Sequence, residues 1–195
     1  MQPTIIDDFI SKSTAEYIHN TLKMEAILNP KGLLNVYLTE RATSMPKSII
    51  DDFISLIVKS VSNQFGFKKD QVKLNRINYQ ILTSGQELGY HSDNNGAYEN
   101  TMDYDGYSAL LYLTDSYEGG EILFYDNNSG DKDLAKSYHP NAGTLVYFKG
   151  DDDYPHSVNE VLAGERANLI LFYDIRLLYL RIDFCEFITK VSCYC

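Results

Sequence analysis

Apolar residues in the first third of the chain recur at the three- and four-residue spacing of a helix face, which predicts two helices. A possible capping box at residues 13–16 predicts that the first helix begins near Ser13, and residues 29–32 are expected to end it. The second helix is expected to begin around residues 44–46 and to end at Gly66, while residues 4–10 favour an extended entry. The first stripe comprises Ala15, Ile18, Leu22 and Ala26, and the second comprises Ile50, Phe53, Ile54, Ile57 and Val61.

From residue 72 onward the pattern changes to short β-rich runs separated by Gly, Asn, Asp and Pro. The runs are residues 72–82, 107–113, 121–125, 144–148, 156–161 and 167–175. Many short strands with polar loops favour an antiparallel barrel or a double-sheet jelly roll over βαβ units. The 195 residues fit one domain, with residues 1–70 as a helical supporting layer, residues 72–176 as a β core and residues 177–195 as a tail of unassigned role.

Composition excludes several classes of protein. A net charge of −10 argues against a protein that tracks nucleic-acid phosphates with a basic surface. No apolar run approaches the roughly 20 residues that span a bilayer, and we expect no secretory signal in MQPTIIDDFI. Cys185, Cys193 and Cys195 are odd in number and form no CxxC pair, so we expect neither a disulfide framework nor a zinc site. These features predict a reduced, cytoplasmic protein.

Candidate chemistry begins with His91 and Asp93, because residues two apart on a strand point to the same face. His156 could add a third ligand from a neighbouring strand. Two histidines and one carboxylate form the facial triad that holds non-haem Fe(II) and leaves positions open for a 2-oxoacid and dioxygen. The pair alone is weak evidence, since a hydrogen-bonded His–Asp pair on a surface has the same pattern.

Arg166 follows His156 by ten residues and precedes the apolar run 167–172. A guanidinium at the start of that strand can bind a carboxylate through two parallel hydrogen bonds. The alternative is an arginine at a strand edge that turns outward to solvent.

Five segments, in this order, together resemble the prolyl 4-hydroxylase-like branch of the 2-oxoglutarate- and Fe(II)-dependent oxygenases. They are residues 84–93, 108–114, 118–124, 142–148 and 156–166. The resemblance covers nearly the whole chain, including the two N-terminal helices. It implies a mainly β protein with flanking N-terminal helices, built as a double-stranded β-helix, which is a distorted jelly roll.

The resemblance also implies functions for individual residues. His91, Asp93 and His156 match the iron ligands of the family, and Arg166 matches the basic residue for the distal carboxylate of 2-oxoglutarate. Tyr112 matches a position whose hydroxyl often supports that carboxylate, although a core aromatic fits equally well.

Two further positions concern the expected cosubstrate site: one is expected to belong to it, and the other departs from the pattern of the family. Ser108 lies on the same strand face as Tyr112 and is expected to belong to the site. The chain departs from the family at Leu82, because many members have a tyrosine nine residues before the first iron histidine. Tyr79 and Tyr90 could replace that tyrosine or could simply pack in the fold.

The implied cofactors are Fe(II), 2-oxoglutarate and O2, with ascorbate as a supporting reductant. Asp93 stands where related halogenases have a small apolar residue, so the resemblance favours hydroxylation of a prolyl or other amino-acid or peptide C–H bond, with succinate and CO2 as co-products. One alternative is a nucleic-acid-demethylating oxygenase. The net charge argues against it, and so does Phe172, which stands at a position where such enzymes usually carry a second arginine. The other is a non-catalytic jelly-roll binding module.

The expected partner is a small amino acid, a peptide or a protein, and the sequence predicts no oligomeric state. Acidic residues are dense in residues 93–106 and 151–153, which flank the candidate metal ligands. They predict either an entrance that favours a cationic substrate or a rim that is merely well solvated.

Overall fold

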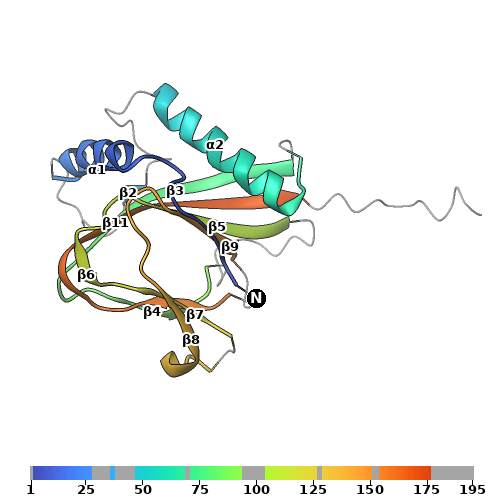
Figure 1. Cartoon of the computed structure of the whole chain (residues 1–195). Helices are drawn as coiled ribbons and strands as arrows, with labels where there is room; N and C mark the ends of the chain where they lie inside the picture. Colours follow the sequence, from blue (N-terminus) through green and yellow to red (C-terminus); the bar gives the residue numbers. More distant parts are fainter. Residues whose placement is uncertain are drawn as a thin grey trace, which may run out of the picture.

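Two antiparallel sheets face each other, and two helices cover the outer face of the larger sheet (Figure 1). The computed structural model describes residues 2–27, 36–37, 47–68, 71–93, 104–126, 129–150 and 154–176. The elements are β1 (Thr4–Ile6), α1 (Lys12–Ile27), β2 (Val36–Tyr37), α2 (Lys47–Phe65), β3 (Val72–Thr83), β4 (Leu88–His91), β5 (Tyr104–Tyr112), β6 (Tyr117–Gly119), β7 (Ile122–Tyr125), η2 (Lys132–Leu134), β8 (Ala135–Tyr138), β9 (Leu145–Lys149), β10 (His156–Val158) and β11 (Val161–Arg176).

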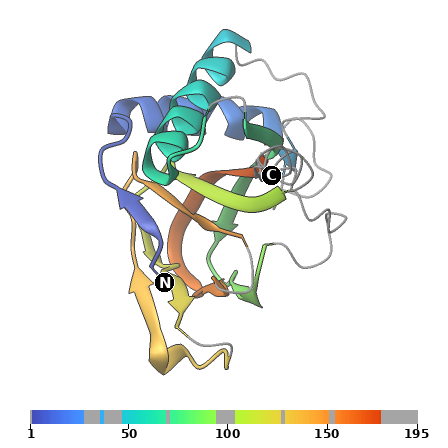
Figure 2. The ribbon, with the colours of Figure 1, turned by 90° about the vertical axis from the view of Figure 1, so that its right-hand side faces the viewer.

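The larger sheet has the strand order β1-β9-β5-β11-β3-β2, with β6 paired to the beginning of β11. The smaller sheet has the order β4-β10-β7-β8. Figure 2 shows the helices on one side of the larger sheet and the smaller sheet on the other. The arrangement confirms the prediction of a jelly roll with N-terminal helices.

The central strands are apolar on both faces because both faces are covered. In β5, Ala109 and Leu111 pack toward the helices, whereas Leu110 and Tyr112 pack between the two sheets. Such strands read as nearly continuous apolar runs rather than as an alternation of apolar and polar residues. The space between the sheets, where the inner face of β5 points, holds the site described below.

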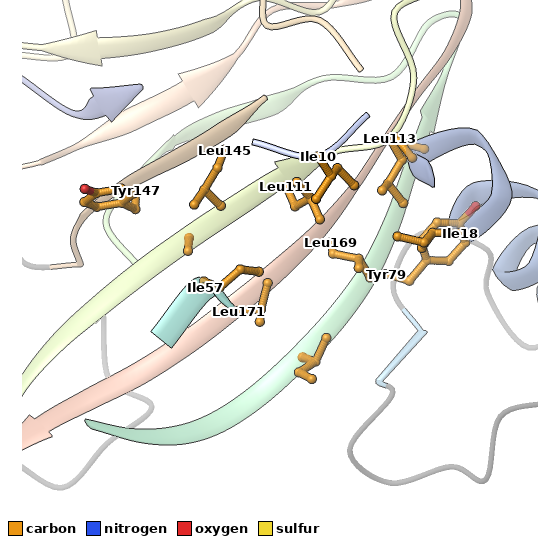
Figure 3. Packing of buried hydrophobic residues seen from close by; sticks show 14 of the residues in the cluster. Ile10, Ile18, Ile57, Tyr79, Leu111, Leu113, Leu145, Tyr147, Leu169 and Leu171 are labelled. Atoms are coloured by element: carbon orange, nitrogen blue, oxygen red, sulfur yellow. The ribbon is translucent and has the colours of Figure 1, made fainter. Parts of the chain in front are cut away.

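The helices are held by the apolar stripes that the sequence predicts. Ile18 of α1 and Ile57 of α2 are fully buried and belong to the same cluster as Tyr79, Leu169 and Leu171 of the sheet (Figure 3). Burial of each such side chain is worth about 1.5–3 kcal/mol. The side chains of Ala26, Ile50 and Phe53, which complete the predicted stripes, lie outside the described part of the structure.

The start of α1 differs from the prediction. The helix begins at Lys12, and its cap is Ser11, whose hydroxyl oxygen accepts the backbone N–H of Thr14 at 3.1 Å. Ser13, the predicted cap, lies inside the first turn. Two serines two residues apart offer equivalent capping signals, and the spacing of the apolar residues does not distinguish them.

The two last predicted strands also differ from the structure. β10 is short, and β11 runs without interruption from Val161 to Arg176, so Arg166 lies inside a strand rather than at its start. The sequence Ala163-Gly164-Glu165-Arg166 lacks an apolar pattern, but Gly164 pairs with β6 and Glu165 with β3. Cross-strand pairing therefore continues the strand through a polar stretch.

Three short strands, β2, β6 and β8, were not predicted, because two to four residues carry too little periodicity. The strand expected to carry both His91 and Asp93 is β4, which ends at His91, so Asp93 follows the strand instead of lying on it. The predicted helix boundaries at residues 29–32 and 44–46, and the tail at 177–195, lie outside the described residues. Within the described ranges, no helix is both long and apolar enough to cross a membrane.

Candidate functional site

His91, Asp93 and His156 meet where β4 pairs with β10. His91 is the direct cross-strand partner of His156, and their ring centroids are 4.3 Å apart. The Nε2 atoms of His91 and His156 lie 3.7 and 3.8 Å from Asp93 Oδ1. One ligand atom from each residue lies within 4.8 Å of the other two, so the three can surround a single metal ion.

Backbone carbonyl groups orient both imidazoles. Nδ1 of His91 bonds the Gly89 carbonyl oxygen at 2.7 Å, and Nδ1 of His156 bonds the Tyr154 carbonyl oxygen at 3.1 Å. A proton on Nδ1 leaves the lone pair of Nε2 directed at the ion site. Burial lowers the pKa of His156, although the Asp93 carboxylate opposes that effect, so the imidazole is kept in the neutral form that a metal needs.

Ser108 orients the carboxylate. Its hydroxyl donates to Asp93 Oδ2 at 2.5 Å, which leaves Oδ1 toward the two histidines. Ser108 thus contacts the metal-binding cluster, whereas the sequence analysis grouped it with the cosubstrate residues.

Arg166 is fully buried on the inner face of the larger sheet. Its Nη2 donates to the Tyr112 hydroxyl at 2.7 Å, its Nη1 donates to Asn168 Oδ1 at 3.4 Å, and its Nε has no hydrogen-bond partner within the described part of the chain. No carboxylate of the described residues pairs with it. A buried cation without an anion is costly, so the arrangement fits a ligand that brings a carboxylate.

Tyr112 is fully buried beneath this guanidinium, whose Cζ lies 4.9 Å from the centroid of its ring. Burial raises the pKa of the Tyr112 hydroxyl, and the neighbouring Arg166 opposes the rise. The hydroxyl therefore stays protonated, and its own O–H can be donated to an anion while its oxygen accepts from Arg166.

One cavity joins the metal-binding cluster to the arginine. It has a volume of about 230 Å³, and its lining includes His91, Asp93, His156 and Arg166. Between these charged ends the wall is largely apolar, and its apolar residues include Leu110, Ile122, Ile170 and Phe172. A small dianion that chelates a metal at one end and meets a guanidinium at the other matches this distribution.

The glycine pair in Gly119-Gly120-Glu121 has a steric reason. Gly120 has φ +65°, and a Cβ there would lie 3.0 Å from Val161 Cγ2 and 3.1 Å from Arg166 Cδ. The motif therefore lets the chain pass close to the arginine side chain.

Tyr79 and Tyr90 were the candidates to replace the family tyrosine that is absent at position 82, and neither of them lines the cavity. Leu82 is buried and is the cross-strand partner of Arg166. The Tyr79 hydroxyl bonds His19 Nδ1 at 2.9 Å on the opposite face of β3, and Tyr90 is 43% exposed and packs edge-on against Tyr125.

Sequence reasoning missed the buried amides of Asn78, Gln80 and Asn168. Each is a polar residue inside an otherwise apolar strand, and that interruption is a signal that could have identified them. Of the acidic residues predicted to flank the entrance, Asp93 belongs to the metal-binding cluster and Asp105 lies in β5, whereas those at residues 94–103 and 151–153 lie outside the described ranges.

Comparisons with solved structures agree with this fold. A prolyl-4-hydroxylase from Pseudomonas putida gives a TM-score of 0.65 at 16% identity, with 89% of this chain and 92% of that chain covered. The viral collagen prolyl hydroxylase of Paramecium bursaria Chlorella virus-1, solved with 2-oxoglutarate, gives 0.65 at 17% identity, with 90% and 96% covered. HygX of Streptomyces hygroscopicus, with nickel and 2-oxoglutarate bound, gives 0.65 at 12% identity, with 91% and 83% covered.

Sequence relatives cover a smaller part. Prolyl 3-hydroxylase 2 of Rattus norvegicus and that of Homo sapiens are each 34% identical over 77 residues, which are 40% of this chain and only 11% of those proteins. Residues 74–174, just over half of the chain, match the profile of the 2OG-Fe(II) oxygenase superfamily. The chain therefore belongs to the 2OG-Fe(II) oxygenase superfamily, whose members use Fe(II), 2-oxoglutarate and O2.

Proposed function

We propose that this protein is a hydroxylase of the prolyl hydroxylase type, which oxidises a C–H bond of a prolyl or other amino-acid residue in a peptide and forms succinate and CO2. The observation that carries the proposal is that a His–Asp–His cluster and a buried arginine without a carboxylate partner among the described residues line the same cavity. We propose that the site belongs to one catalytic domain whose β core spans residues 72–176.

In this proposal His91, Asp93 and His156 hold Fe(II). The ion and its 2-oxoacid supply the activation of O2 and the oxidation of the substrate. Two neutral imidazoles and one carboxylate leave a net positive site that favours an anionic chelator. The rings of Phe148 and Phe124, centred 4.9 and 5.6 Å from that of His156, keep water away from the buried side of the cluster.

Arg166 and Tyr112 are proposed to bind the distal carboxylate of 2-oxoglutarate. The guanidinium supplies charge and N–H donors, and its bond to the Tyr112 hydroxyl fixes its direction. Ser108 is proposed to position Asp93 rather than to touch the cosubstrate.

The substrate class rests on the relatives. The curated sequence relatives are named prolyl 3-hydroxylases, one of the similar structures is named a prolyl-4-hydroxylase, and another is named a collagen prolyl hydroxylase. All three names indicate peptidyl proline, and the first two differ in the ring carbon that is hydroxylated. A peptide or protein partner is accordingly proposed, and nucleic acid is not.

The test is to incubate the Fe(II)-loaded protein with 2-oxoglutarate, ascorbate, O2 and proline-rich peptides. We expect succinate and peptide that gains one oxygen atom, in equal amounts, and an Asp93→Ala variant is expected to form neither. Amino-acid analysis of the product distinguishes 3-hydroxyproline from 4-hydroxyproline. Protein that binds Fe(II) and 2-oxoglutarate but oxidises no peptide in a broad library would contradict the substrate class.

The same assay separates the alternatives. Phe172 lines the cavity where a nucleic-acid demethylase usually carries an arginine, so methylated oligonucleotides are expected to give no succinate above background. A non-catalytic module would bind neither the metal nor the cosubstrate.

The compartment is also a proposal. The three cysteines lie within the last eleven residues and form no CxxC pair, which supports a reducing, cytoplasmic environment. Fractionation of source cells with an antibody tests this, and recovery in a secretory compartment would contradict it.

A further inference from the structure

Asn78 is a buried amide in the wall of the cavity. Its side chain is 5% exposed, it lines the cavity together with the metal-binding cluster and Arg166, and its Oδ1 has no hydrogen-bond partner among the described residues. Leaving a buried polar atom unsatisfied costs about 1–3 kcal/mol, and native proteins seldom keep one without a function.

The strand register places Asn78 toward the metal end of the cavity. Asn78 lies opposite Ile170 in β11, and the next inner-face residue, Phe172, lies opposite Ser108, the partner of Asp93. Inner-face residues repeat every two positions, a step of about 6.6 Å. Asn78 is thus one step from the level of the Asp93 contact and two steps from that of Arg166.

The cavity also lacks a polar group where the family resemblance places one. Leu82 fills that position on the same strand face, and Gln80, a second buried amide, lies between it and Asn78. Amides on β3 therefore provide hydrogen-bonding groups on a wall from which the tyrosine hydroxyl is missing.

We infer that Asn78 is a binding residue for the 2-oxoacid end of the cosubstrate. An amide carries two N–H donors and one carbonyl acceptor and occupies the same volume in either orientation. With Nδ2 in the place of the unpartnered Oδ1, it can donate to a carboxylate or to a keto oxygen beside the metal. It adds donors without adding charge, so the charges of the metal, Asp93 and Arg166 alone balance those of the dianion.

This inference rests on the proposed function, and two ligands separate it from the function of Arg166. 2-Oxoglutarate has both an oxoacid end and a distal carboxylate, whereas pyruvate has only the oxoacid end. With Mn(II) in place of Fe(II), calorimetric titration measures 2-oxoglutarate affinity, and displacement measures pyruvate affinity, without turnover.

We expect Asn78→Leu to weaken the binding of both ligands by about the same factor, near tenfold, which is the effect expected from the loss of one hydrogen bond to a charged ligand group. Arg166→Leu is expected to weaken the binding of 2-oxoglutarate strongly and that of pyruvate little. Asn63→Leu, a change at an exposed asparagine on α2, is the matched control and is expected to keep wild-type affinities. If Asn78→Leu does not fold, Asn78→Ala replaces it, because it only removes atoms.

Unchanged affinity of the Asn78 variant for both 2-oxoacids overturns the inference. So does a variant that binds them normally but needs more peptide for half-maximal turnover, since Asn78 would then contact the primary substrate. Wild-type protein that binds neither Mn(II) nor 2-oxoglutarate instead refutes the proposed function, so the two failures are distinguishable.

Discussion

At the scale of single residues, the metal-binding cluster is built from side chains whose partners leave them little freedom. Each histidine is anchored through Nδ1 to a carbonyl oxygen two residues earlier, and Asp93 is anchored by Ser108. These anchors position the ligand atoms before any ion binds, which reduces the entropy lost on binding.

Ser108→Ala removes the anchor of Asp93. We expect the affinity for Mn(II) or Fe(II) to fall about 10- to 100-fold, the usual effect of losing an orienting partner of a metal ligand. Metal titration followed by calorimetry measures it. Ser137→Ala, at an exposed serine on β8, is the control, and equal affinities in the two variants would show that the hydroxyl bond does not orient the carboxylate.

Gly120→Ala tests the close approach of the glycine pair to Arg166. The new methyl group would crowd Arg166 Cδ, so we expect about tenfold weaker binding of 2-oxoglutarate together with lower stability. Gly66 has a similar positive φ, but no atom of the described residues lies within 4 Å of the new Cβ, so Gly66→Ala is expected to lose about 1 kcal/mol of stability and no affinity. Wild-type affinity in Gly120→Ala would mean that Arg166 does not depend on this contact.

At the scale of elements, α1 is joined to the sheet by a polar network as well as by apolar packing. His19 of α1 accepts or donates a hydrogen bond with the Tyr79 hydroxyl of β3, and its Nε2 lies 3.6 Å from Glu165 of β11. Lys23, one turn later, bonds the same carboxylate at 2.7 Å. The network lies on the face of the sheet opposite the cavity.

This network makes stability depend on pH. Burial lowers the pKa of His19 below its ordinary 6.5, outweighing Glu165, which raises it, while Lys23 lowers it further. The unfolded chain therefore binds the proton more tightly, so the free energy of unfolding is highest above pH 6.5 and decreases as the pH falls below it.

Chemical denaturation between about pH 7 and 5 tests the dependence. We expect the decrease to be smaller in His19→Gln than in the wild type, because the variant has no proton to bind at this position. Identical slopes for the two proteins would refute the assignment to His19.

At the scale of the whole molecule, the two faces of the larger sheet have separate tasks. One face packs against the helices through Ile57 and its neighbours. The other face carries Arg166, which lines the cavity, and the hydroxyls of Tyr112 and Ser108, which bond Arg166 and Asp93. Successive residues of one strand thus serve stability and binding alternately.

Ile57→Ala tests this separation. We expect the free energy of unfolding to fall by about 2–5 kcal/mol, because a fully buried side chain is removed, while the affinity for 2-oxoglutarate stays within about twofold. Leu56→Ala, at a neighbour that is 51% exposed, is expected to change neither quantity appreciably. A parallel loss of affinity in folded Ile57→Ala would show that the two faces are coupled.

The sequence alone predicts the features that depend on local spacing. The helix stripes, the HxD pair of His91 and Asp93, and the general jelly-roll pattern are readable in this way, and family spacing adds His156 and Arg166. Local spacing does not predict the contact of Ser108 with Asp93 or the position of Asn78 in the cavity, because both depend on which strands pair and in which register. Register is a property of residues far apart in the chain, and no periodicity within one strand encodes it.

The central claim is that three side chains from two distant segments hold one metal ion in the cavity that contains Arg166. The most direct measurement is anomalous scattering at the iron edge from anaerobic crystals grown with Fe(II) and 2-oxoglutarate. The account predicts one peak about 2 Å from His91 Nε2, His156 Nε2 and an oxygen of Asp93, with the distal carboxylate of the cosubstrate at Arg166. Iron bound elsewhere, or a cosubstrate that does not reach the guanidinium, would contradict it.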